Sequence, residues 1–63
     1  MYDPKVLTRL ARIEGQVKAL PAMLTEGRYC QDVVTQIRAA RAGLARVEKM
    51  ILAGHLAHCV EGA

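Results

Sequence analysis

Two cysteines and two histidines are the side chains of this 63-residue sequence with the most distinctive chemistry. Cys30 lies in the middle of the chain, whereas His55, His58 and Cys59 lie near its end, in the stretch AGHLAHCVEGA. Thiolate sulfur and imidazole nitrogen are ligands that soft and borderline metal ions prefer. The first hypothesis is therefore a metal site that joins Cys30 to the C-terminal stretch.

Helical spacing selects three of these four side chains. At 100° per residue, His55 and Cys59 each fall about 20° from the line through Cys30 along a helix. His58 falls about 80° away, so we interpret it as a solvated or packing histidine. At 1.5 Å per residue, His55 is ~37 Å from Cys30 along the same helix. The three aligned residues therefore cannot meet within one chain.

Two helical segments must position these residues. Asp3 followed by Pro4 predicts a helix N-terminus, because an Asp side chain caps free amides and Pro fits the first helical position. Gly27 is placed to end the helix in a left-handed conformation. We therefore expect a first helix over residues 4–26. Its apolar residues recur every three or four positions: Val6, Leu7, Leu10, Ile13, Val17, Leu20 and Leu24.

Pro21 interrupts the first helix. It removes a backbone donor and crowds the carbonyl of Val17. We predict a kink near Pro21, because the apolar period continues across it; two shorter helices are the alternative.

The second helix should begin near Tyr29, with Asp32 in its first turn. Its apolar residues alternate steps of three and four, a coiled-coil spacing: Cys30, Val33, Ile37, Ala40, Leu44, Val47 and Ile51. One kinked helix cannot cover so long a seam. The sequence thus predicts an all-α antiparallel helical hairpin, with a short or absent third helix, that pairs with a second subunit into a four-helix bundle.

An antiparallel dimer of the second helix would bring the separated ligands together. Cys30 of one subunit would face His55 and Cys59 of its partner, and the two-fold axis would create two identical sites. Two thiolates with one imidazole suit Cu(I), since structural Zn(II) would require a fourth ligand. Two alternatives remain open: the cysteines are small apolar packing residues, or Cys30 and Cys59 of opposite subunits form a disulfide switch.

The charge pattern predicts a polyanionic partner. The formal net charge is +3 and the isoelectric point is about 9.2. Basic residues cluster on both helices, and an oligomer would repeat them into a broad cationic face able to contact phosphates. They are Lys5, Arg9, Arg12 and Lys18 on the first helix and Arg38, Arg41, Arg46 and Lys49 on the second.

The remaining features exclude several classes of protein. Residues 1–63 are long enough for one domain only. The charged N-terminal stretch does not resemble a signal peptide, and no apolar run reaches ~18 residues, so we expect a cytoplasmic protein without a membrane span. No nucleophile and base stand at a usable spacing and no glycine-rich phosphate loop is present, so we expect neither an enzyme nor a small-molecule substrate.

Three blocks of the sequence resemble the copper-sensing operon repressor (CsoR) family of bacterial metal-sensitive repressors. They are RLARIEGQVKAL at residues 9–20, GRYCQDVVTQIRAARAGL at residues 27–44 and HLAHCV at residues 55–60. The resemblance implies an all-helical dimer that pairs into a homotetramer and binds operator double-stranded DNA. It also implies that metal binding lowers the affinity for DNA and derepresses efflux genes.

The resemblance assigns roles to individual positions. The copper ligands of the family fall on Cys30, His55 and Cys59, and a tyrosine next to the site falls on Tyr29. The DNA-contacting positions fall on Arg9 and Lys49, with Arg12 and Gln16 in the same signature. Members of the family usually continue into a third short helix that carries a glutamate, and this sequence ends at Ala63.

These observations predict a Cu(I)-responsive transcriptional repressor that holds DNA in its apo form and releases it when Cu(I) binds. A small Cu(I)-buffering protein of the same fold, without DNA binding, is the alternative.

Overall fold

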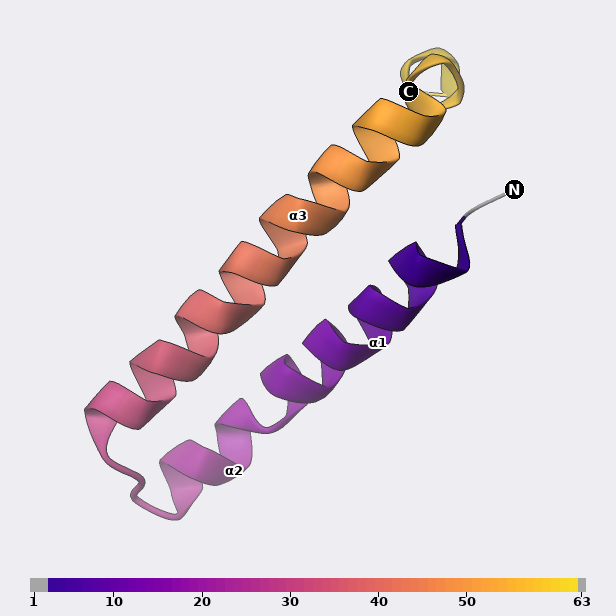
Figure 1. The fold of residues 1–63 in the computed structure, drawn as a ribbon. Helices are drawn as coiled ribbons and strands as arrows, with labels where there is room; N and C mark the ends of the chain where they lie inside the picture. Colours follow the sequence, from indigo (N-terminus) through magenta and orange to yellow (C-terminus); the bar gives the residue numbers. More distant parts are fainter. Residues whose placement is uncertain (1–2, 63) are drawn as a thin grey trace.

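Three helices make up the fold of residues 3–62. The computed structural model describes the backbone of residues 3–62 and the side chains of residues 3–54. The helices are α1 (Pro4–Lys18), α2 (Leu20–Thr25) and α3 (Cys30–Gly62). The chain runs along α1 and α2, turns, and returns along α3 (Figure 1), and the molecule measures 44 × 18 × 16 Å. The predicted all-helical antiparallel hairpin is confirmed.

Local capping fixes the start of α1. The side chain of Asp3 accepts a hydrogen bond from the Lys5 backbone N–H at 2.9 Å, and the Asp3 carbonyl accepts one from Val6 at 2.9 Å. Pro4 occupies the first helical position, where its missing N–H costs nothing. The helix start predicted from the sequence is confirmed.

The first arm of the hairpin is divided into two helices. The prediction of one continuous helix over residues 4–26 is wrong, because α1 ends at Lys18 and α2 begins at Leu20. Pro21 explains the break, since it offers no N–H to the carbonyl four residues before it and its ring crowds that carbonyl. Ala19 keeps a right-handed conformation (φ −77°, ψ −17°) and accepts a hydrogen bond from Met23 at 3.1 Å. The interruption therefore spans one residue.

A Schellman motif turns the chain toward α3. Gly27 has a φ of +74°, a conformation in which a side chain would be strained. Its N–H donates to the Leu24 carbonyl at 3.2 Å, and the Arg28 N–H donates to the Met23 carbonyl at 2.9 Å. The α3 helix then starts at Cys30, one residue after the predicted start. The role predicted for Gly27 is confirmed.

Only part of the predicted α3 seam packs against α1. Val33, Ala40 and Val47 are buried, and the last two form a core with Val6 and Ile13 of α1. The other seam residues face outward or lie at the edge of the core. Ile37 is 39% exposed and Leu44 is 48% exposed, Ile51 is partly buried, and Cys30 is exposed.

The face of α3 that packs on α1 includes three residues that were not in the predicted seam. Gln36, Gly43 and Met50 are partly buried and alternate with the three buried residues in steps of three and four. The seam predicted from the sequence therefore combined residues of two adjacent faces. One face packs on α1, and the other, with Ile37 and Leu44, is exposed.

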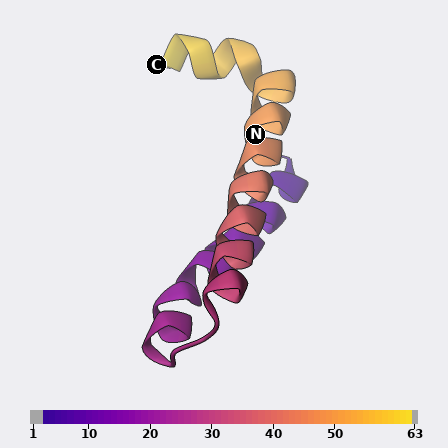
Figure 2. The same cartoon turned by 90° about the vertical axis from the view of Figure 1, so that its left-hand side faces the viewer.

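The last turns of α3, shown in yellow, turn aside from the axis of the hairpin (Figure 2). Among the residues that the structure describes, none of the helices combines the length and hydrophobicity that a bilayer crossing requires.

Candidate metal and DNA-binding sites

The predicted ligand Cys30 is exposed at the first position of α3. Seven-residue steps along a helix advance by about −20°, so Cys30, Ile37 and Leu44 lie on one side of α3. The thiol thus stands at one end of the outward apolar face. A subunit that packs on this face would approach Cys30.

The other two predicted ligands belong to the opposite end of the same helix. The backbone at His55 and Cys59 is part of α3, but their side chains, like that of His58, lie outside the described residues. Among the side chains of residues 3–54, no cluster of three His, Cys, Asp or Glu residues is present. The structure thus brings Cys30 into no metal site within the described part of its own chain, and the intersubunit site stays a prediction.

Tyr29, which was predicted to lie next to the metal site, directly precedes Cys30 in the sequence. Its side chain is 70% exposed, and its carbonyl accepts hydrogen bonds from Asp32 and Val33 at the start of α3. Backbone hydrogen bonds therefore fix the position of Tyr29, while its ring is exposed to solvent.

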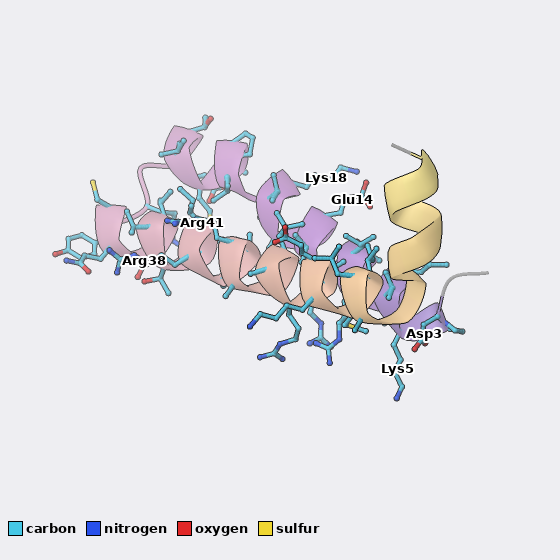
Figure 3. The ribbon with its side chains drawn as sticks, turned by 90° about the horizontal axis from the view of Figure 1, so that it is seen from above. Asp3, Lys5, Glu14, Lys18, Arg38 and Arg41 are labelled. Atoms are coloured by element: carbon cyan, nitrogen blue, oxygen red, sulfur yellow. The ribbon has the colours of Figure 1, made fainter. Side chains whose placement is uncertain are left out.

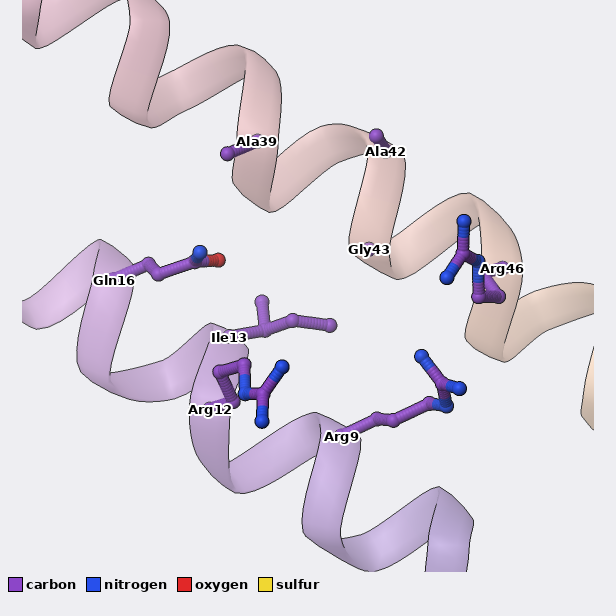
Figure 4. Close-up of a pocket in the computed structure, with 8 residues that line it drawn as sticks. All are labelled: Arg9, Arg12, Ile13, Gln16, Ala39, Ala42, Gly43 and Arg46. Atoms are coloured by element: carbon purple, nitrogen blue, oxygen red, sulfur yellow. The ribbon is translucent and has the colours of Figure 1, made fainter.

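A groove runs between α1 and α3 and has a volume of about 230 Å³. Arg9, Arg12 and Gln16 line it from α1, and Arg46 lines it from α3. The guanidinium groups of Arg9 and Arg46 reach into the groove from opposite walls (Figure 4). The structure therefore brings together three of the four residues predicted to bind DNA.

The other residues that line the groove are small or apolar. They are Ile13, Ala39, Ala42 and Gly43, and none of the described residues that line the groove is acidic. Guanidinium groups bind phosphate oxygens through paired N–H donors. Three of them line this one groove, and no described carboxylate lines it, so its chemistry is suited to an anion such as a phosphate of a nucleic-acid backbone.

Lys49, the fourth predicted DNA-binding residue, is exposed and does not line the groove. It follows Arg46 by three positions, so both lie on the same side of α3. Arg46 was expected only among the general basic residues of the second helix. Its position in the groove depends on how α3 packs against α1, although its three-residue spacing to Lys49 was visible in the sequence.

Gln16 has a second role besides lining the groove. Its backbone carbonyl accepts a hydrogen bond from the Nε2 atom of Gln36 at 3.2 Å. This partly buried bond ties the end of α1 to α3. Gln36 was not singled out from the sequence, because it lies beside the predicted seam and its bonding partner is 20 residues away.

The opposite side of α1 is largely apolar. Leu7, Leu10 and Val17 are 58%, 36% and 46% exposed, and together with Leu44 of α3 they line a hollow that Glu14 and Lys18 also border. The hairpin thus has a cationic edge and an apolar edge. Contiguous exposed apolar surface is typical of protein interfaces, of ligand-binding grooves and of aggregation-prone proteins.

Comparison with known proteins identifies the family. The family model described as a metal-sensitive transcriptional repressor matches residues 2–63. This chain belongs to that family. The resemblance drawn from the three sequence blocks is confirmed.

Two members of the metal-sensitive repressor family illustrate the relationship. The chain is 47% identical over 55 residues to the copper-sensing transcriptional repressor RicR of Mycobacterium tuberculosis, a match that covers 87% of this chain and 57% of RicR. It is 41% identical over 59 residues to the copper-sensing transcriptional repressor CsoR of Bacillus subtilis, covering 94% and 58%. The chain therefore spans less than three fifths of the length of these relatives.

A solved structure of a family member has the same fold. The copper-sensing operon regulator protein CsoRGz superposes with a TM-score of 0.87 at 46% sequence identity. The match covers 94% of this chain and 98% of that chain.

Proposed function

We propose that this protein is a Cu(I)-responsive transcriptional repressor of the cytoplasm, which binds operator DNA in its apo form. The observation that carries the proposal is the groove of Arg9, Arg12 and Arg46 in a member of the metal-sensitive repressor family. A repressor must bind DNA, and this groove offers a cationic surface built from both arms of the hairpin. The relatives named as copper-sensing repressors support copper as the inducer.

The active assembly is a homodimer, or two dimers paired into a homotetramer. The outward apolar residues of both helices support this assembly, since a lone hairpin would leave them in water. Pairing of two α3 helices in antiparallel orientation would place Cys30 of one subunit beside the C-terminal turns of α3 of the other.

The donor set fits Cu(I). The α3 helix carries Cys30 at its first turn and His55 and Cys59 near its end, so one chain supplies one thiol at one end and a thiol and an imidazole at the other. Two soft sulfur ligands and one nitrogen ligand suit Cu(I), whereas a structural Zn(II) site would want a fourth ligand. Cys30 of one subunit with His55 and Cys59 of its partner would hold the ion, and Tyr29 would lie beside them.

Regulation follows from linkage between two sites. Cu(I) can release DNA only if the Cu(I)-bound conformation of the dimer binds DNA more weakly, and then DNA must weaken Cu(I) binding by the same factor. The α3 helix carries the proposed ligands and one wall of the groove, so a shift of α3 against α1 would alter both. No catalytic step is involved, and we expect no enzymatic activity.

Anaerobic Cu(I) titration of the protein bound to labelled DNA tests this function. We expect DNA release as Cu(I) approaches one ion per subunit. The Cys59→Ala variant should hold DNA with the same affinity as the wild type without copper and should keep it when Cu(I) is added. Unchanged DNA affinity of the wild type at saturating Cu(I) would show that the protein is not a copper sensor. Absence of DNA binding by the apo protein would leave the Cu(I)-buffering alternative.

A further inference from the structure

Three neighbouring grooves share lining residues and form one cationic band. The groove between the two helices is called the central groove. A second groove lies on α1 and a third on α3. The α1 groove is lined by Pro4, Lys5, Thr8, Arg9 and Arg12, and the α3 groove by Arg38, Arg41, Ala42 and Ala45. Arg9 and Arg12 belong to the first two grooves, and Ala42 joins the central groove to the third. The central groove therefore borders both of the other grooves.

The helix that supplies the basic side chains changes along this band, from α1 at one end to α3 at the other. On α1 the charge ends at Arg12, because the next residue of the stripe is the neutral Gln16. On α3 it continues from Arg46 to Arg38, eight residues earlier and about 12 Å along the helix. Lys5 lies toward one end of the molecule, and Arg38 and Arg41 lie toward the other (Figure 3). These two arginines extend the cationic surface past Arg12, the last cation of α1 that lines the grooves; Lys18 lines the hollow on the other side of α1.

We propose that Arg38 and Arg41 contact phosphates of the same DNA duplex that the central groove binds. This inference rests on the proposed function and extends its DNA-binding surface by one groove. Both side chains are exposed, and among residues 3–54 no acidic side chain lines any of the three grooves. Duplex DNA carries one negative charge per ~1.7 Å of its axis, so ~12 Å of duplex presents about seven phosphates. A band of this length suits a duplex better than a single small anion.

Salt dependence of DNA binding measures these phosphate interactions directly. The probe is a fluorescein-labelled duplex of mixed sequence, because the phosphate contribution does not depend on base sequence. Its affinity for the apo protein is measured over a series of salt concentrations. The variants are the double substitution Arg38→Gln/Arg41→Gln, the charge-preserving double substitution Arg38→Lys/Arg41→Lys, and Arg9→Gln in the central groove.

Arg28→Gln is the matched control. Arg28 is also an exposed arginine, but it lies in the turn before α3 and lines none of the three grooves. The Schellman hydrogen bond uses its backbone N–H, which the substitution keeps. Circular dichroism checks that every variant retains its helices.

The slope of log affinity against log salt should fall in magnitude by about 0.9 for each phosphate that the protein no longer neutralises. We expect this decrease for the double Gln variant, the wild-type slope for the double Lys variant, and no change for Arg28→Gln. If Arg9→Gln flattens the slope while the double Gln variant behaves like the control, the extended surface is wrong and the central groove stands. If Arg9→Gln also leaves the slope unchanged, neither groove is the DNA-binding surface. Failure of the wild-type apo protein to bind the duplex at low salt would instead show that the proposed DNA-binding function is itself wrong.

Discussion

A Cβ atom on Gly43 of α3 would lie 3.0 Å from both the Cγ1 and the Cδ1 atoms of Ile13 on α1. Ile13 is buried, so it fills the space that this glycine leaves open. Both residues also line the central groove. This close approach therefore sets how near the two helices lie, and with it the separation between the arginines of α1 and Arg46.

Substitution Gly43→Ala should destabilise the fold. The added methyl group forces Ile13 or the helices to move, and overpacking of this kind costs roughly 1–3 kcal/mol. The gain in helix propensity offsets roughly 0.5–1 kcal/mol, so we expect a net loss of about 1 kcal/mol. Thermal unfolding of the apo protein measures it.

Two further variants isolate the cause of this loss. Gly15→Ala changes a glycine with nothing within 4 Å of the added Cβ, so it should stabilise by roughly 0.5–1 kcal/mol. Ile13→Val combined with Gly43→Ala removes one methylene as it adds another, and it should recover part of the lost stability. Equal behaviour of the two glycine variants would contradict the packing argument.

Removal of the Gln36 side-chain amide should loosen the end of α1. The Gln36→Leu variant loses the donor to the Gln16 carbonyl, and a hydrogen bond of this kind contributes about 1 kcal/mol net. We expect a loss of stability of this order in chemical denaturation. Gln31→Leu, at an exposed position of α3, is the control and should leave the unfolding midpoint nearly unchanged.

Mixing of variants tests whether the Cu(I) site is shared between subunits. Cys30→Ala alone and His55→Ala/Cys59→Ala alone should each lack the complete ligand set. A heterodimer of the two has one intact site, built from Cys30 of one subunit and both C-terminal ligands of the other. We expect tight Cu(I) binding to return after the variants are unfolded together and refolded. No recovery in a mixture shown to contain heterodimers would exclude an intersubunit site.

A polar residue on the outward apolar face should weaken self-association. Leu44 is 48% exposed and lies on the same side of α3 as Cys30 and Ile37. Leu44→Gln should raise the dissociation constant of the dimer, because dimerisation would bury the glutamine amide without a hydrogen-bond partner. Analytical ultracentrifugation over a concentration series measures this. An unchanged constant would mean that the dimer uses another surface.

Several features of the hairpin could be predicted because they depend on neighbouring residues. The Asp3 cap, the position of Pro4 and the left-handed Gly27 each follow from bonding within one or two turns of the chain. The break at Ala19 was harder to predict. A proline inside an apolar repeat is compatible with a bend or with two helices, and the choice between them depends on packing as well as on the missing N–H.

The sequence by itself determined that two amphipathic arms exist, where they are capped, and that Cys30 stands too far along α3 from His55 to share a site within one chain. The tertiary structure alone decided the rotation of α3 about its axis. That rotation directs Val33, Ala40 and Val47 at α1, leaves Ile37 and Leu44 outside, and brings Arg46 opposite Arg9. A repeat of apolar residues every three or four positions shows that a helix has an apolar stripe. Which residues of that stripe face the other helix depends on the packing of side chains that are distant in sequence, such as Ile13 against Gly43.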